Sequence, residues 1–228
     1  ITATARVRSG IPYVSVNYAY ATGVKASSAY GTATVANDGS IAAIASGEGA
    51  IVGARGIQAS GTYVSVTNAE GASIDATGEV DVFGGGFATG IEANGIYGVA
   101  VVNDGDIDVY GHAHAYGTHY GAGRAVGIYA AAGYFGNVSV VNTGDISAVA
   151  LGEDSVSWAQ GGAGATGVEA YAKYDATIVN AGDIAAVAQA QFGIASSYGA
   201  IVHGKYSSSI ANEAGSHILS EATVGSSD

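Results

Sequence analysis

Apolar residues recur at every second position in short segments of this chain. In the phrase I-x-A-x-A, for example, Ile146, Ala148 and Ala150 lie two residues apart and therefore share one face of a strand. In the phrase G-[I/V]-x-A the same alternation places charged residues such as Glu92 and Glu169 between apolar ones. No segment keeps apolar residues at helical spacing for long. The pattern predicts short β-strands with an apolar inner face and a polar outer face.

The strand phrases themselves repeat along the chain. An asparagine returns at intervals of 31, 35, 39, 38 and 32 residues, in a phrase close to V-x-N-x-G-x-I-x-A. The glycine that opens G-[I/V]-x-A lies 12 to 15 residues before each asparagine, and a tyrosine follows each of these glycines by seven residues. Such spacing is typical of stacked repeats, so residues 1–228 are expected to form a single β-solenoid domain of about six imperfect repeats. The three columns are Asn37, Asn68, Asn103, Asn142, Asn180 and Asn212; Gly23, Gly56, Gly90, Gly127, Gly167 and Gly199; and Tyr30, Tyr63, Tyr97, Tyr134, Tyr174 and Tyr206.

Two architectures suit strand repeats of this length. A β-propeller blade needs four strands in about 40–45 residues, whereas a parallel β-helix would use each repeat for about two coils of roughly 16–20 residues. The offset from glycine to tyrosine is fixed, but the distance from each asparagine to the next glycine varies from 19 to 25 residues. Loops at one edge of a coil tolerate that variation. We therefore expect an all-β fold, a parallel β-helix with about two coils per 31–39-residue repeat.

The repeated side chains have structural roles in such a fold. Asparagine and glycine in N-x-G suit a sharp turn, and asparagines stacked once per repeat can hydrogen-bond to one another as an amide ladder. The Val or Ile two residues before each asparagine, and the Ile of the strand that follows, should form inner ladders. Each tyrosine lies an even number of residues after the apolar positions of G-[I/V]-x-A, so continued alternation would turn it inward. The rings are therefore expected to pack against the core at a corner. An exposed aromatic strip for sugar or surface binding is the alternative.

The composition narrows the function classes. Apolar residues make up 48% of the chain, which is too high for a disordered linker even with 37 glycines. There is no cysteine, and hence no disulfide or thiolate metal site. The net charge of −12 argues against a nucleic-acid partner, which requires clustered Lys and Arg, and suits a surface outside the cell. No run of about 18 apolar residues exists to form a transmembrane helix.

The repeated phrases resemble a known family. V-x-N-x-G-x-I-x-A-x-A and G-I-x-A look like the passenger regions of bacterial autotransporters (type V secretion), and the resemblance covers nearly the whole chain. It implies a right-handed parallel β-helix that is extracellular or on the outer cell surface of a Gram-negative bacterium. Passengers of that family include adhesins, enzymes and structural stalks. The resemblance therefore implies cell-surface glycans or other cells as partners, without identifying one.

One loop carries candidate zinc or copper ligands. His112 and His114 lie two residues apart and would share a strand face, and His119 or Asp108 could complete the set. No second ligand cluster has a defined spacing. We therefore interpret this segment as an exposed polar loop and expect no metal there.

The turn at residues 103–108 carries candidate calcium ligands. Asp104, Asp106 and Asp108 offer oxygen atoms around a turn, which calcium favours. The corresponding turns at Asp145 and Asp183 carry one aspartate each, so a repeated calcium site is not expected. At most a single weak calcium site is predicted at 103–108, and no other cofactor.

A column of carboxylates raises the question of polysaccharide cleavage. Asp106, Asp145 and Asp183 occupy equivalent places in successive repeats. With about two coils between neighbours at ~4.8 Å each, they would lie roughly 10 Å apart, too far for a retaining or an inverting pair. We therefore expect a non-catalytic structural or adhesive protein. A polysaccharide-degrading or polysaccharide-binding β-helix is the alternative.

The two ends of the sequence carry opposite charges. Arg6 and Arg8 lie near the start, and Glu213, Glu221 and Asp228 near the end. The sequence begins within one repeat and finishes within another, so both terminal coils are expected to expose unpaired N–H and C=O groups, which template further strand pairing. We therefore expect the chain to bind itself end to end and to form surface filaments if the rotation does not close a ring.

Overall fold

The protein is an all-β solenoid, as the alternation predicts. The computed structural model describes residues 1–7, 17–115, 121–154 and 162–225, and these residues form parallel strands and no helix. The described part of the chain accordingly contains no helix that could cross a membrane. The strands are β1 (Thr2–Val7), β2 (Asn17–Ser27), β3 (Thr32–Asn37), β4 (Ser40–Asn68), β5 (Ser73–Asn103), β6 (Asp106–Ala115), β7 (Gly121–Ala132), β8 (Asn137–Asn142), β9 (Ile146–Asp154), β10 (Gly162–Ala172), β11 (Asp175–Asn180), β12 (Ile184–Ala190), β13 (Ile194–Gly204), β14 (Ser207–Asn212) and β15 (Ile218–Val224).

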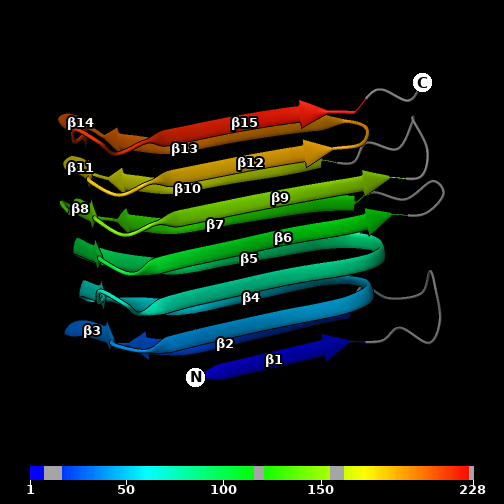
Figure 1. Ribbon diagram of the computed structural model, residues 1–228. Helices are drawn as coiled ribbons and strands as arrows, with labels where there is room; N and C mark the ends of the chain where they lie inside the picture. Colours follow the sequence, from blue (N-terminus) through cyan, green and yellow to red (C-terminus); the bar gives the residue numbers. More distant parts are fainter. Residues whose placement is uncertain (8–16, 116–120, 155–161, 226–228) are drawn as a thin grey trace.

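Each coil of the solenoid has three faces (Figure 1). The front sheet contains β1, β6, β9, β12 and β15 together with residues 40–48 of β4 and 73–81 of β5. The back sheet contains β2, β7, β10 and β13 together with residues 50–60 and 84–95. A side sheet of shorter strands contains β3, β8, β11 and β14 together with residues 63–68 and 98–103. The chain runs from front to back to side and then begins the next coil.

Each sequence repeat makes one coil, and the expectation of about two coils per repeat is wrong. Asn37 pairs in register with Asn68, Asn68 with Asn103, and Asn103 with Asn142, so neighbouring coils are one repeat apart. The strands are longer than expected, and β4 runs for 29 residues around almost a whole coil. Three faces of this length contain all the residues of one repeat. Equivalent residues of successive repeats are therefore about 4.8 Å apart rather than about 10 Å.

The predicted inner ladders form the core between the sheets. Side chains of these ladders in the central coils are almost completely buried, and each buried Val or Ile contributes roughly 1.5–3 kcal/mol. The front ladder is Ile41, Ile74, Ile107, Ile146 and Ile184; the back ladder is Ile57, Ile91, Ile128 and Val168; and the side ladder is Val35, Val66, Val101, Val140 and Ile178.

The glycine column lets the back sheet approach the front isoleucine ladder closely. A Cβ atom placed on Gly90 would lie 2.4 Å from Cγ2 of Ile107 and 2.6 Å from the carbonyl oxygen of Gly127. All six glycines of the column face an isoleucine Cγ2 in this way, at 2.2–2.4 Å. The pairing of residues between coils skips the glycine every time, so two consecutive residues face the core there. No larger residue fits this position without displacing backbone.

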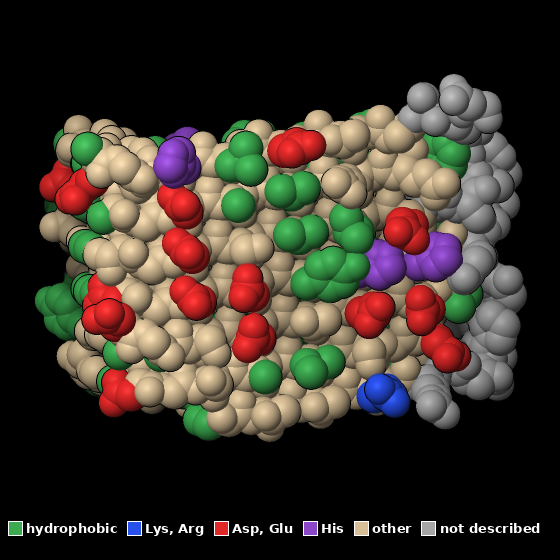
Figure 2. Space-filling view, viewed as in Figure 1, with side chains coloured by type: hydrophobic (Ala, Val, Ile, Leu, Met, Phe, Trp, Pro, Cys, Tyr) green, Lys and Arg blue, Asp and Glu red, His purple; other side chains and the backbone are tan. Residues whose placement is uncertain are grey.

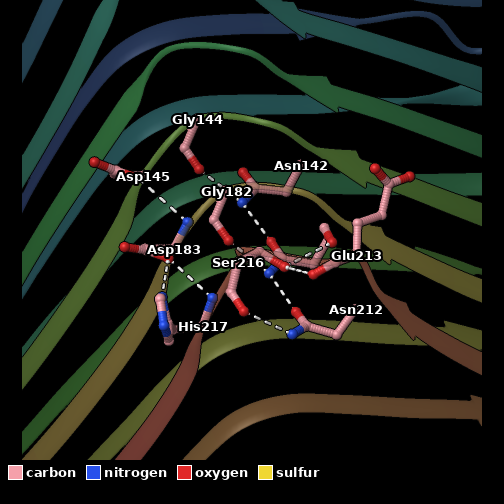
Figure 3. A network of polar contacts seen from close by, with 10 residues as sticks. Asn142, Gly144, Asp145, Gly182, Asp183, Asn212, Glu213, Ser216 and His217 are labelled. Carbon is pink, nitrogen blue, oxygen red and sulfur yellow. Dashed lines mark hydrogen bonds and ion pairs between the residues drawn. The ribbon is translucent and has the colours of Figure 1, made fainter.

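The asparagines form the predicted amide ladder inside the solenoid. Nδ2 of each asparagine donates to Oδ1 of the asparagine one coil further on, at 2.7–2.8 Å, from Asn37 through to Asn212. The same Nδ2 atoms of Asn103, Asn142 and Asn180 donate to the carbonyl oxygen two residues later, which closes the turn. Figure 3 shows this contact between Asn142 and Gly144. These three side chains have no exposed surface. Their complete hydrogen bonding is what permits a row of amides to be buried.

Candidate functional site

The tyrosine column lies on the outer surface, and its expected packing against the core is wrong. Tyr97 is 46% exposed and Tyr63, Tyr134, Tyr206 and Tyr30 are more exposed still, whereas Tyr174 is partly buried. The tyrosines lie at the corner between the back and side sheets, where regular alternation stops: β2, β7, β10 and β13 end before their tyrosines, and the pairing of β4 with β5 shifts register between Gly61 and Tyr63. The structure therefore presents the aromatic strip that was the alternative interpretation.

Two pairs of neighbouring rings in this column contact each other. The ring centroids of Tyr63 and Tyr97 are 6.1 Å apart, and those of Tyr174 and Tyr206 are 5.2 Å apart. Phe135 adds a ring 5.6 Å from Tyr174. It is 63% exposed and adopts a positive φ of 57°, a conformation that L-residues with large side chains rarely take. A strained backbone that holds an apolar ring in solvent is a feature of residues that contact a partner or ligand.

A second candidate site is a hollow of about 430 Å³ on the outer face of the back sheet, which faces away in Figure 1. Side chains from four consecutive coils line it, from β4, β5, β7 and β10. They stand on both sides of the glycine column, where the strands depart from regular pairing. The lining residues are Arg55, Phe87, Ala88, Thr89, Glu92, Arg124, Val126, Tyr129, Glu169 and Tyr171.

Glu92 is fully engaged at one end of the hollow. One carboxylate oxygen pairs with Arg55 Nε, and the other accepts from Gln58 Nε2 at 3.4 Å and Asn94 Nδ2 at 3.1 Å. Arg55 also lies over the ring of Tyr20, with Cζ 5.9 Å from the ring centroid. This network fixes the Arg55 and Glu92 side chains and cancels their charges.

Glu169 is much less satisfied at the other end. Its side chain is 7% exposed, and Oε1 accepts from Arg124 Nη2 at 3.3 Å. Within the described residues this is the one hydrogen bond of the Glu169 side chain, so the second carboxylate oxygen keeps its acceptor capacity. The Arg124 side chain is 53% exposed and keeps free donors. Glu169 and Arg124 together can therefore accept from and donate to a ligand.

Tyr129 lies between the two glutamates, because Glu92, Tyr129 and Glu169 pair in register on consecutive coils. Its ring centroid is 5.9 Å from that of Tyr171, which in turn stacks on His203 at 5.3 Å. Burial, and then the nearby Glu169, raise the pKa of both the Tyr129 and the Tyr171 hydroxyl. The two hydroxyls therefore stay protonated and can donate hydrogen bonds at neutral pH.

The histidines considered as zinc or copper ligands lie on the front sheet beside two glutamates. Nδ1 of His112 is 3.7 Å from Glu79 Oε1 and Nε2 is 3.7 Å from Glu153 Oε2, and among the described residues neither ring nitrogen has a hydrogen-bond partner. The rings of His112 and His114 stack with centroids 6.4 Å apart. In the part of the chain that the structure describes, no three His, Asp or Glu side chains are grouped to hold a metal ion. His119 lies outside the described residues.

The structure does not bring the candidate calcium ligands together. Asn103, which begins the turn, is part of the buried amide ladder and is unavailable to a cation. Asp104 Oδ1 accepts from the hydroxyl of Thr143 on the next coil at 2.7 Å. Asp108 lies further along β6, where burial and then the charges of Asp75, Asp106 and Asp145 raise the pKa of its carboxyl.

The aspartate column runs up the front face, where acidic side chains gather over successive coils (Figure 2). Asp106, Asp145 and Asp183 are one coil apart, about 4.8 Å, so the spacing no longer excludes a retaining pair. The contacts of Asp145 and Asp183 are nevertheless structural (Figure 3). Asp145 accepts from the backbone N–H of Asp183 at 3.3 Å, and Asp183 from that of His217 at 2.9 Å. The hydrogen bonds from the His217 side chain and backbone lower the pKa of the Asp183 carboxyl.

Analysis of the sequence missed the hollow. Glu92 and Glu169 were noted as outward-facing residues, but Arg55 and Arg124 were not connected with them. The sequence does indicate the hollow once the repeats are stacked as one coil each. Aligned on the glycine column, all four residues fall within three positions of the glycine on neighbouring coils.

Comparison of the chain with protein-family models, with curated proteins and with solved structures found no match. The parallel β-solenoid therefore rests on the strand pairing itself, and function has to be argued from the side chains.

Proposed function

We propose that this protein is a non-catalytic, extracellular structural and adhesive β-solenoid that presents the tyrosine column to other surfaces. The observation that carries the proposal is the exposure of aromatic rings in successive coils. A contiguous apolar surface on a soluble chain marks an interaction site, and tyrosine supplies contact area together with a hydroxyl that remains hydrated. The stacked coils place these rings one after another along the solenoid axis, and in two neighbouring pairs the ring centroids lie 6.1 and 5.2 Å apart.

Charge and repeat style support a location outside the cell. The net charge of −12 keeps such a surface soluble. The resemblance of the repeats to autotransporter passengers favours the outer surface of a Gram-negative bacterium, with cell-surface glycans or other cells as partners.

Replacing both Tyr63 and Tyr97 by Ser tests the adhesive role. Both rings are about half exposed, so each substitution should lower the free energy of unfolding by about 1–2 kcal/mol, and circular dichroism establishes that the variant is folded. Retention of bacterial cells on a surface coated with the variant should fall roughly tenfold, the effect of losing about 1.4 kcal/mol of contact. Ser65→Ala, on the same strand, is the matched control and should leave retention unchanged. Equal retention by the double variant and the wild type would refute the proposal.

Hydrolysis of a polysaccharide is less well supported. The two glutamates of the hollow are two coils apart, about 9.6 Å along the backbone, near the upper limit for an inverting pair. In an inverting pair, however, each carboxyl group needs an oxygen that is free to give or take a proton, one as the general acid and the other as the general base. Both oxygens of Glu92 already accept hydrogen bonds from the protein.

End-to-end association is a further part of the proposal. The amide ladder has a direction, because every Nδ2 donates toward the following coil, so copies that extend it must align head to tail. Arg6 lies on β1 at one end, and Glu213 and Glu221 lie at the other end; Arg8 and Asp228 fall outside the described residues. The described residues place seven strands in the front sheet and six in each other sheet. If β1 of one copy paired with β15 of the next copy, β2 of the first copy would lie one coil too far from β13 of the second copy to pair with it.

Complete contact between copies requires one front strand to move aside. We therefore expect a variant that lacks residues 1–7 to associate at lower concentration than the full chain in sedimentation velocity. The loss of Arg6 matters little by comparison, because an exposed ion pair contributes about 0–1 kcal/mol. Monomeric behaviour of both chains at high concentration would contradict end-to-end association.

A further inference from the structure

We propose that the hollow on the back sheet binds a neutral oligosaccharide. The hollow lies on a different face from the tyrosine column and does not depend on the adhesive role of that column. At about 430 Å³ it falls in the size range of ligand sites, and it combines aromatic rings with a few convergent polar groups.

The charges of the hollow favour an uncharged ligand. Arg55 is paired with Glu92 and Arg124 with Glu169, so neither sign of charge is in excess. An anionic ligand would have to compete with a carboxylate for each guanidinium. A sugar hydroxyl instead both donates and accepts, so it can bond to the unfilled oxygen of Glu169 and to the free donors of Arg124 at the same time.

The aromatic side chains suit the other face of a sugar ring. Tyr129 and Tyr171 are partly buried and lie side by side on successive coils, with the partly exposed ring of Phe87 on the other side of the hollow. The C–H groups of a pyranose ring are apolar and pack on aromatic faces, while its hydroxyl groups point outward to the polar rim. The two tyrosine hydroxyls, protonated at neutral pH, add donors.

The shape of the hollow favours a chain of sugars over a single ring or a peptide. Four coils line it, which corresponds to a length of about 14 Å along the stack. A peptide that binds along a sheet needs an edge strand with free backbone groups. The back-sheet strands of these coils are hydrogen-bonded on both sides, so the hollow offers side chains only.

Titration calorimetry with neutral hexasaccharides tests the site. We expect at least one of cellohexaose, maltohexaose and mannohexaose to bind the wild-type chain, and Tyr129→Ala and Tyr171→Ala each to weaken that binding at least tenfold. Tyr110→Ala, on β6 of the front sheet and outside both the hollow and the tyrosine column, is the matched control and should change the affinity less than twofold. Far-UV circular dichroism and urea midpoints establish that each variant is folded.

The binding of an acidic sugar gives an independent measurement. Trigalacturonate should bind the wild-type chain more weakly than the best neutral sugar. In Glu169→Gln, which frees Arg124 from its carboxylate, the binding of trigalacturonate should increase. The proposal is overturned if no neutral hexasaccharide binds at millimolar concentration, if folded Tyr129→Ala and Tyr171→Ala bind as well as the wild type, or if only the acidic sugar or an unrelated peptide binds.

Discussion

Asn103→Asp should lower the free energy of unfolding by about 3–5 kcal/mol at neutral pH, the cost of leaving a buried charge without a partner. The two side chains have nearly the same shape, so packing does not change. In the wild type the Asn103 amide nitrogen donates to Asn142 Oδ1 at 2.7 Å and to the carbonyl oxygen of Gly105 at 2.8 Å. After the substitution a carboxylate oxygen faces both acceptors in a position with no exposed surface. Urea denaturation measures the loss.

The pH dependence of this variant has a defined sign. Burial raises the pKa of the introduced carboxyl above its ordinary value of about 3.9. The difference from the wild type should therefore be small below about pH 4, where the group is protonated in both states, and should grow as the pH rises toward the folded-state pKa.

Asn137→Asp is the matched control. Asn137 is exposed, and its side-chain oxygen accepts from the backbone N–H of Asp175 at 3.2 Å, a role that a carboxylate also fills. This variant should stay within roughly 0.5 kcal/mol of the wild type. Similar losses for the two variants would contradict the buried amide ladder.

Gly127→Ala should destabilise the protein by about 1–3 kcal/mol, although alanine is a common strand residue here. The added Cβ would lie 2.3 Å from Cγ2 of Ile146 and 2.5 Å from the carbonyl oxygen of Gly167. The methyl group can rotate away only in part, and the carbonyl belongs to the backbone of the next coil. Relief of the overlap must therefore separate the front and back sheets or distort their pairing. Chemical denaturation again provides the measurement.

Gly133→Ala isolates the steric effect. The contacts nearest to a Cβ at Gly133 are backbone oxygens at 3.7 and 3.8 Å, which is ordinary van der Waals distance. This substitution should be close to neutral or slightly stabilising, because alanine restricts the unfolded chain. If Gly127→Ala were equally well tolerated, the close approach of the two sheets at the glycine column would be wrong.

The core could be predicted from the sequence because each inner position has the same packing neighbours in every repeat. Every coil places an isoleucine and an asparagine against identical neighbours one coil away, so Ile107 and Asn103 recur with little change. Two-residue alternation then gives the inner face directly. The asparagines were recognisable as an amide ladder because an apolar core tolerates a repeated amide only when each one bonds to the next.

Two features could not be predicted because they depend on where regular alternation stops. The tyrosines lie at the corner between the back and side sheets, where most back strands end and the β4–β5 pairing shifts register, so two-residue alternation continued across that corner gives the wrong face. The number of coils per repeat depends on how far the strands continue around the corners. Gly49, with a positive φ of 59°, and residues 61–62 of β4 lie at such corners, and the strand continues through both of them.

The hollow was not predictable for a different reason. Its residues repeat in no column, since Glu92, Tyr129 and Glu169 share one outward row while Arg55 and Arg124 come from two others. Outward positions have no shared packing partner, so nothing in the repeat fixes their identity. They become a site only when the coils are stacked one repeat apart.

One distance tests that stacking most directly. The chain contains no cysteine, so Thr34→Cys and Ser209→Cys introduce two unique sites for spin labels on exposed positions of the side sheet. Through the paired residues Ser65, Ala100, Ser139 and Thr177 these positions are five coils apart. Pulsed electron–electron resonance should give a distance of about 24 Å for one coil per repeat. A distance of about 48 Å, as two coils per repeat would require, or a broad distribution without a maximum, would contradict the account.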